Sequence, residues 1–120
     1  MTGISFVADT NFLIDVHEGA IKTEPFLEGI VAASVISEIE LLGWQNISEH
    51  DKIALRELLQ DCILIELTPE IKHIAIQLKQ LQKIKIPDAI VAATSIFLNL
   101  PLVTSDKGFK NIKGLELILL

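Results

Sequence analysis

Short apolar runs alternate with amphipathic segments along the whole chain. The runs typical of β-strands are residues 4–8, 30–35, 63–67, 102–104 and 115–120. The segments with polar caps and apolar positions at helical spacing are residues 12–18, 38–42, 48–60, 69–82 and 87–98. Strands that are apolar throughout are typical of parallel sheets covered on both sides. The pattern therefore predicts an α/β fold with a mostly parallel central β-sheet flanked by helices on both faces.

Length and composition indicate one domain. A chain of 120 residues and 13.3 kDa is long enough for a single core, so we expect residues 1–120 to form one domain. Half of the residues are hydrophobic and the mean hydropathy is +0.49, which predicts an apolar surface that meets a partner. The longest nearly apolar run, residues 89–98, is well below the ~18 residues that a membrane span needs.

Cysteine content and the N-terminus predict a cytoplasmic protein. The single cysteine, Cys62, cannot form an internal disulfide, and we expect it to lie in a buried strand in a reducing compartment. The first residues carry neither a basic segment nor the apolar core of a secretion signal. Neither feature predicts a membrane protein or a secreted one.

The net charge of −6 has the wrong sign for a protein that binds nucleic acid through a broad basic surface. This argues against sequence-independent DNA binding. It leaves open an enzyme that meets phosphate through divalent metal ions, because bound dications would offset the acidic charge at the site.

Four carboxylates stand where such a fold would form a site. Asp9 and Asp106 each follow the carboxyl end of a predicted strand, where sites in open parallel sheets form. Asp88 lies in the first turn of a predicted helix, and Glu40 lies one turn into the helix after the second strand. If the first and fourth strands are neighbours, Asp9 and Asp106 converge, and Glu40 can reach the same rim, whereas Asp88 can lie at either end of the sheet. Four acids at one rim repel one another unless a cation joins them. Oxygen ligands alone favour Mg²⁺ or Mn²⁺ over zinc.

Each acid also has an interpretation without chemistry. Asp9 can be a helix cap, and Glu40 can complete a capping box opened by Ser37. Asp88 can merely favour the helix dipole, and Asp106 can belong to an ordinary turn. None of the four is decisive alone, and their shared placement favours a site.

Two acidic-cluster families fit the chain badly. Phosphatases of the haloacid dehalogenase type need a second aspartate two positions after the nucleophile, and Asn11 stands there. Phospho-receiver domains need an aspartate at the end of the third strand, which here ends in Leu67, Thr68 and Pro69. A glycine-rich phosphate loop and a Gly-x-Ser-x-Gly elbow are also missing from the sequence.

Four motifs in order resemble those of PIN domains, and especially VapC-type toxins of bacterial type II toxin–antitoxin pairs. They are Val-Ala-Asp-Thr-Asn-Phe-Leu-Ile-Asp at 7–15, Ser-Val-Ile-Ser-Glu-Ile-Glu-Leu-Leu-Gly at 34–43, Ile-Pro-Asp-Ala-Ile-Val-Ala-Ala-Thr at 86–94 and Leu-Val-Thr-Ser-Asp at 102–106. The first motif alone has little specificity. All four at domain spacing cover essentially the whole chain and are much more specific.

The resemblance implies a metal-dependent endoribonuclease. By motif match, Mg²⁺ or Mn²⁺ would be held by Asp9, Glu40, Asp88 and Asp106. The metal would activate a water for in-line attack on phosphorus and leave a 5′-phosphate on the product. The residues expected to orient ligands or substrate from the edge are Thr10, Asn11 and Thr104.

The second motif contains two acids that compete for one role. Glu38 and Glu40 are only two positions apart, and the resemblance favours Glu40 because it stands three residues after a serine and directly before Leu-Leu-Gly.

The resemblance also implies partners, namely an RNA substrate, a cognate antitoxin protein and a second copy in a homodimer. One departure concerns the antitoxin, because the segment between Asp15 and Ile30 is shorter than is usual in the toxin branch. The alternatives are a catalytically inert PIN-fold module that binds RNA or protein, and an aspartate-based phosphohydrolase or receiver domain.

Several residues outside the acidic motifs also have candidate roles. Trp44 follows a helix stop and can be either a core edge or an exposed anchor for a partner. The three histidines are expected at the surface; they are His17, His50 and His73. Four lysines can guide RNA phosphates or be solvated loop residues; they are Lys85, Lys107, Lys110 and Lys113.

Overall fold

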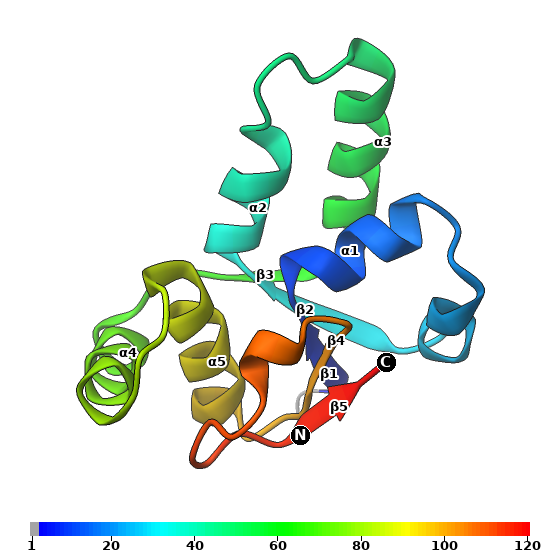
Figure 1. The fold of residues 1–120 in the computed structure, drawn as a ribbon. Helices are drawn as coiled ribbons and strands as arrows, with labels where there is room; N and C mark the ends of the chain where they lie inside the picture. The colour runs from blue at the N-terminus through cyan, green and yellow to red at the C-terminus, as the bar shows by residue number, and fades with distance from the viewer. Residues whose placement is uncertain (1–2) are drawn as a thin grey trace.

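A computed structural model describes residues 3–120 and contains one five-stranded sheet (Figure 1). The strands are β1 (Ile4–Ala8), β2 (Ile30–Ser34), β3 (Ile63–Ile65), β4 (Leu102–Thr104) and β5 (Leu117–Leu119). Their order is β3-β2-β1-β4-β5, and every pair of neighbours is parallel. The predicted α/β class is confirmed, and the sheet is parallel throughout rather than mostly so.

Two layers of helices cover the sheet. The α-helices are α1 (Thr10–His17), α2 (Val35–Leu42), α3 (Glu49–Gln60), α4 (Pro69–Leu81) and α5 (Ile86–Leu98), and the 3₁₀ helices are η1 (Ile21–Phe26) and η2 (Lys107–Phe109). In Figure 1, α1, α2 and α3 gather on one side and α4 and α5 on the other. Strand side chains alternate between the two layers, since Val7 packs with α4 and α5 while Phe6 and Ala8 pack with α1 to α3. Helices on both faces are therefore confirmed.

Local signals fix where most helices begin and end. Asp9, Ser48 and Thr68 each cap a helix by accepting a hydrogen bond from a backbone N–H in its first turn. Asn99 ends α5 in the left-handed conformation, as expected from the break predicted there. These caps agree with the predicted helices to within about two residues.

The helix α2 begins earlier than predicted. Ser34, at the end of β2, accepts from the backbone N–H of Ile36 and caps a helix that starts at Val35. Ser37 is therefore an interior residue of α2, and the capping box proposed for Ser37 and Glu40 is wrong. The strand signal and the cap signal overlap at Ser34, which placed the predicted start three residues late.

Two further predictions need correction. Cys62 precedes β3 and is half-buried, with its thiol near the carbonyl of Leu58, so it is not a buried strand residue. His17 is only partly exposed, because its Nε2 lies 3.1 Å from Asp51 Oδ1 on α3. His50 and His73 lie at the surface as expected. Among residues 3–120, no helix is long and apolar enough to cross a membrane.

Candidate active site

The order of strands brings the sequence-predicted acids to the end of the sheet where the strands have their carboxyl termini. β1 and β4 are parallel neighbours, with Ala8 opposite Val103, so Asp9 and Asp106 follow adjacent strands at the same end. A cavity of about 340 Å³ opens there. Its lining includes all four predicted carboxylates, Asp9, Glu40, Asp88 and Asp106. Site formation outside the carboxyl ends of parallel strands is the behaviour expected of this fold class.

Asp9 is the most buried of the four acids, with 2% of its surface exposed. Its Oδ1 accepts from the backbone N–H of Phe12 at 2.8 Å, and its Oδ2 accepts from Thr104 Oγ1 at 2.6 Å. Burial raises the pKa of Asp9 to about 6, although these hydrogen bonds oppose the rise and the charge of Asp106 adds to it. Asp9 is thus both the cap of α1 and a member of the cluster.

Like charges also act on Asp88. Burial raises its pKa first, and the charges of Asp106 and Glu40 raise it further, while Lys85 lowers it. Asp88 lies in the first turn of α5, where the helix dipole favours its ionised form. The two acids whose charges act on Asp88 or Asp9 are Asp106 and Glu40, which come from separate segments. Repulsion of this kind is the electrostatic condition under which a bound cation is favourable.

Glu40 is held by a contact from the first motif. Thr10 Oγ1 donates to Glu40 Oε1 at 2.6 Å and lies 3.1 Å from Ser37 Oγ. This places Thr10 beside a carboxylate, as expected of a supporting residue. The competing acid Glu38 lines a separate hollow with Arg56 between α2 and α3, so the structure brings Glu40 and not Glu38 to the acidic cavity.

A clamp of three hydrogen bonds joins the start of α1 to the turn after β4. Thr104 Oγ1 donates to Asp9, Asn11 Nδ2 donates to Asp106 Oδ2 at 3.4 Å, and Ser105 Oγ donates to Asp15 Oδ2 at 3.0 Å. We call these three pairs the β1–β4 clamp.

The turn that bears Asp106 is further closed by its own backbone. The amide of Asp106 donates to Thr104 Oγ1 at 2.9 Å, and Asp106 Oδ1 accepts from the amide of Gly108 at 2.8 Å. Thr104 and Asn11 therefore each form a hydrogen bond with one of the acids. Asp15 and Ser105 belong to the first and fourth motifs, but nothing in the sequence indicated that their side chains meet.

The donor set fits a hard dication in its chemistry and charge. It offers carboxylate and hydroxyl oxygens without histidine or cysteine, which suits Mg²⁺ or Mn²⁺. Within residues 3–120, no three or more Asp, Glu, His or Cys side chains already stand together as a coordination set. Each oxygen of Asp9 accepts one hydrogen bond and keeps a lone pair for an ion, which would have to draw the other carboxylates closer.

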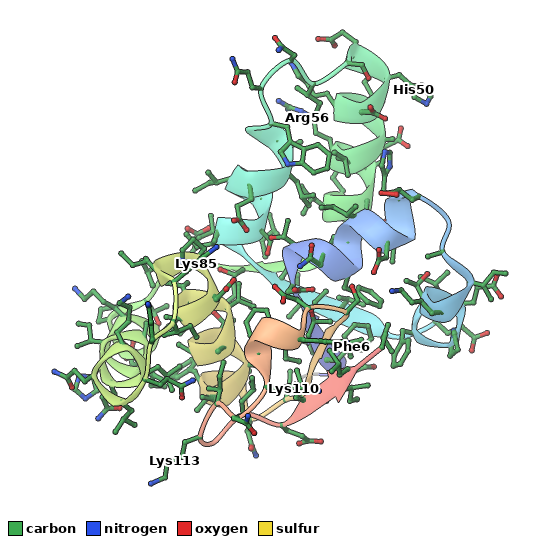
Figure 2. All side chains as sticks on the ribbon, in the orientation of Figure 1. Phe6, His50, Arg56, Lys85, Lys110 and Lys113 are labelled. Atoms are coloured by element: carbon green, nitrogen blue, oxygen red, sulfur yellow. The ribbon has the colours of Figure 1, made fainter. Side chains whose placement is uncertain are left out.

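Lys85 contributes the basic charge of the cavity lining. It precedes α5, and in Figure 2 its side chain lies near the N-terminal end of that helix. Lys110 and Lys113 lie below Lys85 in the same view and do not line this cavity, and Lys113 lines a different hollow. Among the four lysines considered from sequence, the structure favours Lys85 as a partner for phosphate.

The fold and the cavity together define a class of protein. It is an all-parallel α/β domain in which carboxylates line a cavity at the carboxyl ends of the strands. A family model described as PIN domain matches residues 6–115. The chain therefore belongs to the PIN domain family, the family that its four motifs resemble.

Solved structures support the assignment along the whole chain. A chain of a toxin–antitoxin complex from Klebsiella pneumoniae is 31% identical, with a TM-score of 0.80 over 95% of this chain and 96% of that one. VapBC2 from Rickettsia felis, bound to a DNA fragment from its promoter, has 21% identity and a TM-score of 0.84 over 98% and 99%. DNA-bound VapBC from Salmonella typhimurium has 16% identity and a TM-score of 0.83 over 96% and 97%. The chain is thus VapC-like, and a comparison with curated protein sequences gave no match.

Proposed function

We propose that this protein is an endoribonuclease that depends on Mg²⁺ or Mn²⁺ and acts as the toxin of a toxin–antitoxin pair. One observation carries the proposal, namely that four acids from four segments of the chain line one cavity, with Asp9 the most buried of them. A purely structural role would not require like charges from separate segments to raise the pKa values of Asp9 and Asp88.

Asp9, Glu40, Asp88 and Asp106 are the residues that would hold the ion. The chemistry that a dication held there would supply is a nucleophilic water at neutral pH and positive charge opposite the phosphate. Asp9 remains fixed by the amide of Phe12 and the hydroxyl of Thr104, so its carboxylate has one orientation. Thr10 orients Glu40, and Asn11 orients Asp106. Lys85 offers a cation at the cavity lining for a neighbouring phosphate of the substrate.

The test is 5′-end sequencing of total cellular RNA after incubation with the purified protein. Wild type and Asp9→Asn are run in parallel, each with Mn²⁺ and with chelator. We expect new 5′-phosphate ends only with wild type and Mn²⁺. A second matched variant, Glu38→Gln, changes the acid that lies outside the cavity and should cleave like wild type.

The outcomes separate the alternatives. Absence of new ends together with absence of Mn²⁺ binding would overturn the nuclease and leave an inert PIN-fold binding module. Cleavage that survives chelator would overturn the metal dependence. Transfer of phosphate from a phosphodonor onto Asp9 would instead support a phosphohydrolase or receiver, a reading that the lining of the cavity does not favour because no β3 residue reaches it.

The antitoxin part of the proposal is supported by similarity to a chain of a toxin–antitoxin complex at 31% identity. The expected partner is a small protein encoded beside this chain. Expression of the chain alone should arrest growth, and coexpression of the neighbouring reading frame should restore it. Growth arrest that persists with Asp9→Asn would show that the arrest does not come from the proposed nuclease.

A further inference from the structure

Trp44 shares the cavity with the four carboxylates, and the proposed reaction gives it no task. Its side chain is 44% exposed, although an indole is one of the larger apolar groups in a protein. It stands four residues after Glu40, just beyond the C-terminal end of α2. Ile14 of α1 lines the same cavity, so an apolar margin adjoins the acidic centre.

The backbone around Trp44 is tightly determined. Gly43 closes α2 by donating to the carbonyl of Ile39 at 2.8 Å, and a Cβ on Gly43 would lie 2.5 Å from that oxygen. The carbonyl of Trp44 then accepts from the amide of Ile47 at 3.3 Å, and Asn46 adopts a positive φ of 63°. A backbone held by such a turn keeps the indole at the cavity, so little backbone freedom is lost when a ligand binds there.

The chemistry beside Trp44 selects a nucleotide as its occupant. A flat ring, a cluster of carboxylates suited to a dication and the cation of Lys85 together match a base, the scissile phosphate and a neighbouring phosphate. Proteins bind unpaired nucleotides by stacking bases on aromatic rings, whereas bases inside an A-form duplex present no free face. Stacking tolerates any base, which suits a ring that offers one hydrogen-bond donor.

We propose that Trp44 stacks on an unpaired base next to the scissile phosphate and so contributes to the affinity of the site for its RNA substrate. This inference rests on the proposed ribonuclease function and names a further substrate-contacting residue of that same site. Trp44 is a substrate-contacting residue, and the carboxylates remain responsible for the chemistry. A protein side chain on Trp44, from an antitoxin for instance, is the competing outcome.

The chain offers a direct probe, because Trp44 is its one tryptophan and it has no tyrosine. The RNA is a 12-nucleotide strand carrying the cleavage motif found by 5′-end sequencing, used alone and annealed to its complement. Binding is followed by tryptophan fluorescence with Ca²⁺ in place of Mg²⁺, and a gel checks that the RNA stays intact. We expect quenching by the single strand and none by the duplex.

Kinetics provide the second measurement. Base–aromatic stacking contributes ~1–3 kcal/mol per base, so Trp44→Ala should raise KM for the single strand by roughly 5- to 150-fold. Most of the loss should fall on KM rather than kcat, since stacking is equally available before and during the reaction. Trp44→Phe keeps a flat ring and should remain within about 3-fold of wild type, and circular dichroism checks that both variants fold.

An abasic scan identifies the base. Removing one base of the RNA should reproduce the KM of Trp44→Ala, and the two changes combined should cost no more than either alone. An active enzyme whose KM is unchanged in Trp44→Ala, or whose fluorescence is not quenched by the single strand, overturns the inference while the ribonuclease stands. Equal losses in Trp44→Phe and Trp44→Ala also overturn it. Failure of wild type to cleave any RNA removes the proposed function, and the inference with it.

Discussion

At the residue scale, Asp9 is a carboxylate whose ionisation works against the folded state. Its ordinary pKa is 3.8 and burial raises it to about 6, so the folded protein binds the proton more tightly than the unfolded chain does. The favourable contribution of its neutral form is complete below pH ~4 and is lost as the pH rises through about 6. At pH 7.5 an ionised Asp9 therefore destabilises the metal-free protein.

We expect Asp9→Asn to be more stable than wild type at pH 7.5 in chelator, by on the order of 1–3 kcal/mol. The amide keeps the shape and an oxygen for the N–H of Phe12. Urea unfolding at pH 7.5 and at pH 4 measures the difference, which should shrink at the lower pH. Added Mn²⁺ should stabilise wild type and not the variant. A variant that is equally destabilised at both pH values would mean that packing, not charge, dominates at this position.

For a single residue, the sequence often allows two roles, such as a helix cap and a member of a site, and does not show which applies. Asp9 caps α1 and lines the acidic cavity at once, so its role as a cap does not exclude a role in the site. For Glu40 the cap interpretation is wrong, because its partner is Thr10, 30 residues away in the chain. Spacing within one helix cannot reveal a partner that only the folded sheet brings near.

At the scale of elements, the β1–β4 clamp ties the α1 segment to the turn that carries Asp106. Ser105 does not touch the cavity, and its hydroxyl acts through Asp15. We expect Ser105→Ala to lower kcat by roughly 3- to 10-fold, since one hydrogen bond contributes about 1 kcal/mol to the position of the turn. Steady-state kinetics and Mn²⁺ titration measure the effect, and Ser105→Thr should restore it.

Lys22→Ala is the matched control for this prediction. It removes the other partner of Asp15, whose Oδ2 lies 3.6 Å from Lys22 Nζ, without touching the turn. Both side chains of that pair are partly exposed, so it should matter little. A Lys22→Ala enzyme impaired as much as Ser105→Ala would indicate that the charge of Asp15, and not the clamp, is what the site needs.

The end of α2 gives a second prediction at this scale. Gly43→Ala would force a Cβ against the carbonyl of Ile39, which should cost about 1–3 kcal/mol and displace Trp44. The tryptophan emission maximum should shift and KM should rise. Gly19→Ala serves as a control, because it strains a positive φ of 74° far from the cavity and should cost about 1 kcal/mol with unchanged emission. Unchanged emission in Gly43→Ala would contradict the proposed role of the turn.

Elements were predicted well where the signal is local and poorly where two signals overlap. The runs at β1 and β4 and the caps Ser48 and Thr68 are local, and they appear as expected. β3 is shorter than its apolar run, since β2 pairs only with Ile63 to Ile65. The extent of a strand depends on its neighbour, which the run itself does not contain. The choice between core and surface for Trp44 likewise depended on which elements lie opposite it.

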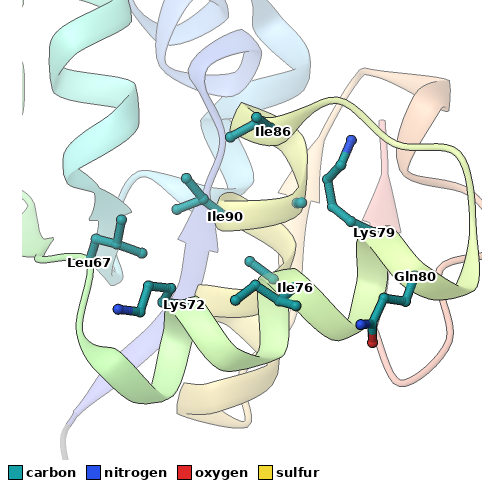
Figure 3. A pocket seen from close by; sticks show the side chains of 9 residues that line it. Leu67, Lys72, Ile76, Lys79, Gln80, Ile86 and Ile90 are labelled. Carbon is teal, nitrogen blue, oxygen red and sulfur yellow. The ribbon is translucent and has the colours of Figure 1, made fainter.

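At the scale of the whole molecule, the outer surface of one helical layer is apolar. The layer of α4 and α5 leaves apolar side chains uncovered around a hollow of about 480 Å³, seen in Figure 3. Leu67, Ile76 and Ile86 are its exposed hydrophobic residues, and the last is 63% exposed. The high mean hydropathy predicted such a surface, and the sequence alone could not locate it because each of these residues belongs to an otherwise amphipathic helix or a strand end.

We infer that this face forms the homodimer interface expected from the sequence. Ile86→Glu places a charge at the start of α5 in the face and should shift the protein from dimer to monomer in sedimentation at micromolar concentration. Ile21→Glu is the matched control, because Ile21 is 79% exposed on η1 and lies outside the face, so the variant should remain dimeric. Both variants replace exposed residues and should keep the wild-type circular dichroism.

Because Asp88 follows Ile86 by two residues, a dimer formed on this face would link the oligomeric state to the proposed active site through α5. A second copy on this face would fix the first turn of α5, which carries both Asp88 and the preceding Lys85. The Ile86→Glu monomer should therefore cleave RNA more slowly than wild type at equal subunit concentration, and Mn²⁺ should bind it more weakly. A fully active monomer would separate the two properties and restrict the role of the apolar face to assembly. A dimeric Ile86→Glu protein would move the interface to another surface.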